Sequence, residues 1–121
     1  MEIHSNVSHM KEELIALRRD LHQHPEVAFQ ETRTSNIAAE QLRSAGFQVE
    51  TGIGKTGVVG TLNFGKSGKT LMIRADMDAL PIQEIDGRPY GSNTSGRMHA
   101  CGHDAHTSVA LIVAQLLSRY K

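Results

Sequence analysis

Apolar residues recur at spacings of three and four near the start of the chain, which predicts an amphipathic helix. The recurring positions are Val7, Met10, Leu14, Leu17 and Leu21. Ser8 is placed to cap the start of this helix, and Pro25 limits its end. The same spacing over 32–45 predicts a second helix, which Gly46 can end in a left-handed conformation. Both helices present one apolar face and are expected to pack on a sheet.

Short runs typical of strands follow the second helix, at 47–50, 57–64 and 70–75. The third run, TLMIRA, is nearly continuous in apolar residues, as expected of a strand covered on both faces. It ends in Asp76-Met77-Asp78, so two carboxylates should lie at the carboxyl end of that strand. Residues 81–100 are predicted to form a long loop, and a last helix is predicted to start near Asp104. The expected fold class is therefore α/β.

Composition excludes several classes of function. The 121 residues make one domain at most, and 13 basic residues balance 13 acidic ones, so no net charge draws nucleic acid or an anionic membrane. The N-terminus has no apolar stretch of signal-peptide length, and the longest apolar run, Val109 to Ala114, is too short to span a bilayer. The single cysteine cannot form an internal disulfide, which fits a reducing compartment. We expect a cytoplasmic protein.

The segment GTLNFGKS, Gly60 to Ser67, fits the phosphate-loop pattern G-x-x-x-x-G-K-[ST] letter by letter. That motif binds phosphate where a glycine-rich loop leads from a strand directly into a helix. Here the flanking residues are predicted to be strands, and Gly65 and Gly68 suit a hairpin turn. Nucleotide binding is therefore kept only as a minor alternative.

The segment MHACGHDAHT, 98–107, concentrates three histidines, an aspartate and the only cysteine of the chain. Thiolate and imidazole are natural zinc ligands, so Cys101 and His103 are candidate metal ligands. Asp104 and His106 are expected to line the same site or to orient its ligands. The strand-end carboxylates, Asp76 and Asp78, are plausible additional donors.

Two other interpretations of this segment stay open. Cys101 could be a nucleophile activated by His103 or His106, although no orienting partner or oxyanion site is evident. It could also be a plain buried thiol beside a surface imidazole. The remaining histidines of interest carry no role here: His22 and His24 are interpreted as helix-end residues, and His99 as loop filling unless the fold turns it inward.

Four stretches of the chain together resemble the amidohydrolase branch of the aminoacylase and carboxypeptidase-type dinuclear metallopeptidases. This branch contains hippurate hydrolases, N-acyl-amino-acid amidohydrolases and auxin-conjugate hydrolases. The four stretches are LRRDLHQHPEVAFQE (17–31), KTGVVGTL (55–62), IRADMDALPIQE (73–84) and MHACGHDAHT (98–107). Their order and spacing are similar to those of the family, which makes the resemblance specific.

The resemblance implies two divalent metal ions that hold a water for attack on an amide carbonyl, in the manner of two-metal hydrolysis. The family's ligand pair falls on Cys101 and His103. In related branches a histidine ligand occupies the position of Asp76, so Asp76 is expected to line the site. Asp78 keeps the position of the residue that orients a ligand. Zinc or manganese is expected, with cobalt or nickel as possible substitutes, and the implied substrate is a small N-acyl or conjugated amino acid.

The family's catalytic domain extends beyond a stretch of this length, to a glutamate general base and further histidine ligands. Residues 1–121 are therefore expected to be the N-terminal part of a three-layer α/β/α catalytic domain with an incomplete sheet, without the lid and dimerisation domain. Complete members of the family are homodimers. The second hypothesis is a catalytically inactive remnant that binds metal weakly or associates with other chains.

Overall fold

The first predicted helix is divided in two. The computed structural model describes residues 5–65, 67–85 and 87–120, and its first elements are α1 (Ser5–Ser8) and α2 (Lys11–Gln23). The expected cap at Ser8 is wrong, because Ser8 ends α1 while Met10 precedes α2 without a side-chain cap. The turn between the helices allows Met10 to be buried. The end of α2 at Gln23 confirms the limit set by Pro25.

Helix α3 (Thr32–Ser44) confirms the second predicted helix and its glycine stop. Gly46 has φ +85°, in the left-handed region that favours glycine. Its amide donates to the carbonyl of Arg43 at 2.9 Å, and the Phe47 amide donates to Leu42 at 3.0 Å. These two bonds satisfy carbonyls that the end of a helix leaves unpaired, and they direct the chain into the hairpin.

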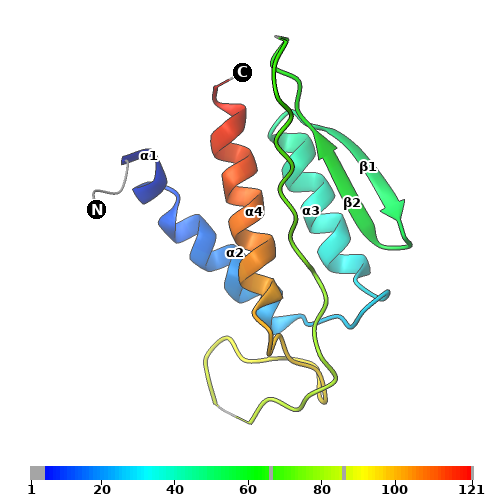
Figure 1. Ribbon diagram of the computed structural model, residues 1–121. Coiled ribbons are helices and arrows are strands. Elements are labelled where there is room, and N and C mark those ends of the chain that lie inside the picture. The colour runs from blue at the N-terminus through cyan, green and yellow to red at the C-terminus, as the bar shows by residue number, and fades with distance from the viewer. Residues whose placement is uncertain (1–4, 66, 86, 121) are drawn as a thin grey trace.

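The hairpin consists of β1 (Gln48–Ile53) and β2 (Gly57–Thr61), paired antiparallel with Gln48 opposite Thr61 and Glu50 opposite Val59. Helix α3 packs against both strands and also against α4 (His103–Ser118). Helix α4 in turn contacts α2. Figure 1 shows the resulting order, with α4 between α2 and α3 and the hairpin on the far flank of α3.

The third predicted strand is the main difference from expectation. Residues 68–78 run as extended chain past α4 and α3 (Figure 1), but no strand is formed among them. Leu71 and Met72 are 74% and 86% exposed, so the expected cover on both faces is wrong for this chain. A strand can form only where a neighbouring segment supplies hydrogen-bond partners. The partner of β1 is the run 57–61, and residues 70–75 have no such pairing among the described residues.

The predicted long loop is closed by a short pairing at its base. Leu80 and Met98 exchange two backbone hydrogen bonds, of 2.9 and 3.0 Å, and Ala79 bridges to Val27. The last helix, α4, begins within one residue of the predicted position. Among the described residues no helix is both long and apolar enough to cross a membrane. Mixed helix and strand content confirms the α/β fold class.

Candidate metal centre

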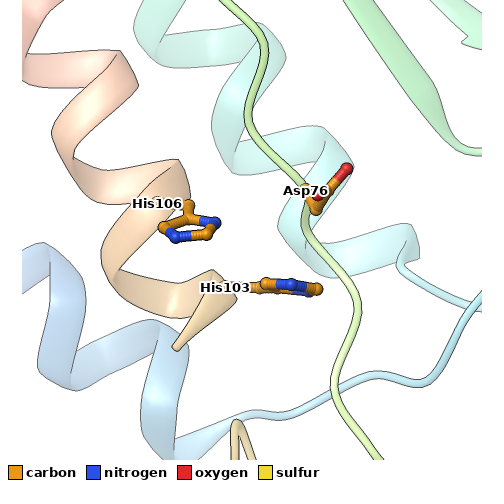
Figure 2. Close-up of side chains that lie close together, drawn as sticks. All are labelled: Asp76, His103 and His106. Carbon is orange, nitrogen blue, oxygen red and sulfur yellow. The ribbon is translucent and has the colours of Figure 1, made fainter. Parts of the chain in front are cut away.

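Three possible metal ligands converge where the start of α4 meets the extended chain. His103 and His106 lie three residues apart in the first turn of α4 and so share a face of the helix. Asp76 comes from the 68–78 segment beside them, as Figure 2 shows. One ligand atom from each residue lies within 4.8 Å of the other two. A carboxylate and two imidazoles are a donor set suited to zinc and neighbouring divalent metals.

A tight turn sets the start of α4. The Gly102 amide donates to the His99 carbonyl at 3.2 Å, and Gly102 has φ +79°. The Gly102 carbonyl then accepts from Ala105 and His106, which starts the helix. Cys101 occupies the exposed corner of this turn and is not a member of the three-residue cluster. The structure therefore brings His103 together with Asp76 and His106, whereas the predicted Cys101 lies in the adjoining turn.

Asp78 fixes the orientation of the His103 ring. Nδ1 of His103 lies 2.9 Å from the carboxylate of Asp78 and 2.9 Å from its backbone carbonyl. Both partners are acceptors, so Nδ1 carries the hydrogen and Nε2 of the neutral ring keeps its lone pair. A histidine that binds metal through one ring nitrogen commonly donates the hydrogen of the other nitrogen to a carboxylate or carbonyl. The residues present therefore fit a divalent metal at Nε2.

The backbone of Asp76 is also fixed to α4. The Thr107 hydroxyl donates to the Asp76 carbonyl at 3.0 Å, and Thr107 is buried. The Asp76 carboxylate accepts from Arg74, which is largely exposed, at 2.6 Å. The ring of His106 stacks on that of His103 with centroids 5.3 Å apart. The cluster is thus partly fixed before any metal binds.

Asp104 faces away from this cluster into a buried network. Its Oδ2 accepts from Nδ1 of His22 at 2.7 Å and from Nε of Arg18 at 2.8 Å. Nε2 of His22 lies 3.1 Å from Glu84. The His22, Asp104 and Glu84 side chains are 1%, 0% and 5% exposed. The Asp104 carboxylate is thus bonded to α2 rather than to His103 or His106.

His99 is turned inward and left without hydrogen-bond partners. It is 4% exposed, and neither ring nitrogen has a partner within the described part of the chain. Burial lowers the pKa of His99 below its ordinary value, and nearby His22 and His103 act in the same direction against the opposing carboxylates. A buried neutral imidazole therefore lies beside the cluster of possible metal ligands.

Sequence reasoning placed His22 at a helix end without predicting its burial, and it allowed for an inward His99 only as an exception. A signal existed for His22, because it lies eight residues after Leu14 and one after Leu21, on the predicted buried stripe of the helix. No comparable periodicity marks His99, which lies in an irregular segment. Its burial follows from the pairing of Met98 with Leu80, and that pairing joins distant parts of the chain.

The phosphate-loop pattern lacks the structure that its chemistry requires. Gly65 has φ +69° at a bend, but the predicted hairpin turn is wrong because no strand follows it among the described residues, and Lys66 lies outside them. In the described residues after Ser67 the chain is first extended, over 68–78, and the next helix begins at His103. A helix N-terminus that could cradle phosphate is therefore missing at this position.

The region of the cluster corresponds to a known family. Residues 72–121 match the model of peptidase family M20/M25/M40. The part of the chain that carries the cluster therefore matches this family, and relatives are similar to nearly the whole chain. It is 42% identical to the hippurate hydrolase of Campylobacter jejuni over 118 residues, which is 98% of this chain and 31% of that protein. It is 43% identical to the N-acyl-L-amino acid amidohydrolase of Geobacillus stearothermophilus over 99% of this chain and 32% of that protein.

A solved structure shows the same likeness to the M20 family. The Bacillus subtilis YXEP protein, described as a dinuclear metal-binding peptidase of the M20 family, is 40% identical, with a TM-score of 0.87. The match covers 93% of this chain and 32% of that one. The chain therefore has the fold of the corresponding part of an M20 aminohydrolase, and it spans about a third of the length of its curated relatives.

Proposed function

We propose that this chain supplies the metal-binding part of an amidohydrolase centre that cleaves the amide bond of N-acyl or conjugated amino acids. The observation that carries the proposal is the convergence of Asp76, His103 and His106, with Nδ1 of His103 held by Asp78. Relatives that are named hippurate hydrolase and N-acyl-L-amino acid amidohydrolase support the substrate class. A dinuclear relative supports a pair of metal ions.

The chain's own residues would hold and orient the metal ions. His103 would offer Nε2, while Asp78 keeps the opposite ring nitrogen protonated. The family resemblance adds Cys101 as a ligand, and the geometry adds Asp76 and His106. Bound divalent metal supplies an ionised water at neutral pH and polarises the carbonyl of the amide. His103 belongs to both ligand sets, so it is the residue on which the proposal depends.

Calorimetric titration of Zn²⁺ and Mn²⁺ at neutral pH tests the metal site. Wild type is compared with His103→Ala, Cys101→Ala and His106→Ala. His24→Ala is the matched control, because His24 lies at the end of α2 and bonds the Asp20 carbonyl, outside the cluster. We expect saturable binding by wild type and the control, and its loss in His103→Ala, with circular dichroism verifying that each variant is folded.

The two other variants decide between the ligand sets. Greater loss of affinity in Cys101→Ala than in His106→Ala would favour the pair implied by the family, and the reverse would favour the geometric cluster. Absence of saturable binding by wild type, or unchanged binding in His103→Ala, would contradict the proposal.

Hydrolysis is tested separately with N-benzoylglycine and N-acetyl amino acids, by measuring release of the free amino acid. Activity that requires metal and His103 would support the amidohydrolase. Metal binding without turnover would favour the alternative of a catalytically inactive metal-binding remnant.

A further inference from the structure

A buried imidazole joins three separate parts of the chain next to the metal cluster. His22, near the end of α2, is 1% exposed and contacts a carboxylate through each ring nitrogen. Nδ1 lies 2.7 Å from Asp104 in α4, and Nε2 lies 3.1 Å from Glu84 in the long loop. Each carboxylate can only accept, so a hydrogen on each ring nitrogen is needed to make both bonds together. Such charge-assisted bonds are among the stronger ones in proteins.

The contact to Asp104 acts on the first turn of α4. This turn carries no side-chain cap, and Gly102 at its start offers no side chain. Asp104 lies between His103 and His106, and its Oδ2 also accepts from Arg18. The anchors of Asp104 on α2 therefore fix the rotation of the helical turn that bears both histidines. A small rotation of that turn would separate them from Asp76.

The contact to Glu84 acts on the long loop. The second oxygen of Glu84 accepts from the Ser92 amide at 2.6 Å, and the Asn93 amide donates to the Gln23 carbonyl at 2.9 Å. Tyr90 meets the edge of the His22 ring, with centroids 5.8 Å apart. The loop is thereby held against α2 close to the segment that leads into α4.

We propose that His22 is a positioning residue of the metal centre. Its imidazole ties Asp104 to Glu84 and so sets the direction in which His103 and His106 face Asp76. The inference rests on the proposed function, since it assigns His22 a role in the same site. His22 touches none of the three possible ligands through the hydrogen bonds described above, and it acts through Asp104.

The test compares His22→Gln with His24→Gln. The control histidine lies two residues further along, is 39% exposed in its side chain and bonds the Asp20 carbonyl rather than the buried carboxylates. A third variant, Glu84→Gln, removes the negative charge that faces Nε2 of His22 and leaves the contact between His22 and Asp104 in place. Two properties are measured: the visible spectrum and affinity of bound Co²⁺, and hydrogen exchange of the backbone amides in metal-free protein.

In His22→Gln we expect Co²⁺ affinity to fall about tenfold, the typical effect of losing an outer contact in a metal site. The d–d bands should change because the ligand geometry changes, and amides 105–107 and Ser92 should exchange faster. Glu84→Gln should accelerate exchange at Ser92 with a smaller effect on the Co²⁺ spectrum. His24→Gln should match wild type in every measurement.

An unchanged spectrum, affinity and exchange pattern in His22→Gln would overturn the inference while leaving the proposed function in place. If His22→Gln does not fold, Glu84→Gln decides, and wild-type exchange at Ser92 in that variant would overturn the link to the loop. Failure of wild type to bind Co²⁺ would contradict the proposed function, and therefore also the role of His22 in a metal centre. The exchange data would then show only whether His22 holds the first turn of α4.

Discussion

The Asp78 carboxylate and carbonyl both meet Nδ1 of His103, which makes this residue the support of the ring. The carbonyl contact belongs to the backbone and survives any substitution that leaves the chain in place. The carboxylate contact places a negative charge beside the ring, and such an outer contact strengthens a histidine as a metal ligand. Orientation therefore has two sources at this histidine, and only one of them can be removed by mutation.

Asp78→Ala should weaken metal binding without abolishing it. We expect an increase in Kd of about tenfold. This is the lower end of the range for loss of a contact to a metal ligand, because the carbonyl of residue 78 still holds the ring. Calorimetry with Zn²⁺ measures the change. Asp20→Ala is the control, since Asp20 is a half-exposed carboxylate that pairs with Arg33. A Kd equal to that of wild type would show that the carboxylate has no part in orientation.

Residue identity alone indicated several residues that lie together in the structure. The Cys-x-His pair at 101–103 and the DxD segment at 76–78 pointed to His103, Asp76 and Asp78, and the structure brings these three residues together. The sequence could not predict which of Cys101 and His106 lies nearer to Asp76 and His103, because this depends on the rotation of the first turn of α4. That rotation is set by His22 and Arg18, which are far away in the sequence.

At the level of elements, backbone conformation at single glycines decides where helices begin and end. Gly46 ends α3 with φ +85°, and Gly102 precedes α4 with φ +79°. For residues with a Cβ, steric contacts raise the free energy of this backbone conformation by about 1–2 kcal/mol. A Cβ at Gly46 would meet no atom within 4 Å, so the cost there is conformational rather than a clash.

Gly46→Ala should therefore lower the free energy of unfolding by about 1 kcal/mol or somewhat more. Urea denaturation monitored by circular dichroism measures the change. Gly68→Ala is a matched control, because Gly68 has equally open surroundings and no positive φ. The control should be neutral or slightly stabilising. Equal effects of the two substitutions would contradict the assigned role of the left-handed conformation.

Helices were predicted better than strands for a physical reason. The signals for α3 lie within its own sequence, in the spacing of apolar residues and in Gly46. The run 70–75 has the composition of a buried strand, yet strand pairing depends on another segment to supply hydrogen bonds. Within the described chain no such partner reaches it, and Leu71 and Met72 stay exposed.

At the level of the whole molecule, a buried polar group makes stability depend on pH. His99 has two unpartnered ring nitrogens, and burial lowers its pKa below the ordinary value of 6.5. Below pH 6.5 the unfolded chain binds a proton at His99 that the folded chain does not. The free energy of unfolding therefore falls as the pH decreases from 6.5 toward the lower pKa of the folded state.

His99→Phe should reduce this dependence in the metal-free protein. One proton accounts for a slope of at most about 1.4 kcal/mol per pH unit. Phenylalanine fills similar space without unpaired nitrogens, so stability at pH 8 should stay close to that of wild type. Urea unfolding at several pH values between 5 and 8, in the presence of a chelator, measures the slope. Parallel curves for the two proteins would contradict the assignment of the slope to His99.

Two backbone hydrogen bonds between Leu80 and Met98 close the long loop at its base. The geometry of the site therefore does not depend on the length of the loop. Each end of the loop is fixed by a backbone pair, and Glu84 and Ser92 add a second closure inside it. Residues between 84 and 92 can therefore change in number without moving the residues that lead to His103, at an entropic cost that grows only slowly with length. The length of this stretch can thus vary during evolution, provided that Tyr90 keeps its contact with His22, while the cluster keeps its geometry.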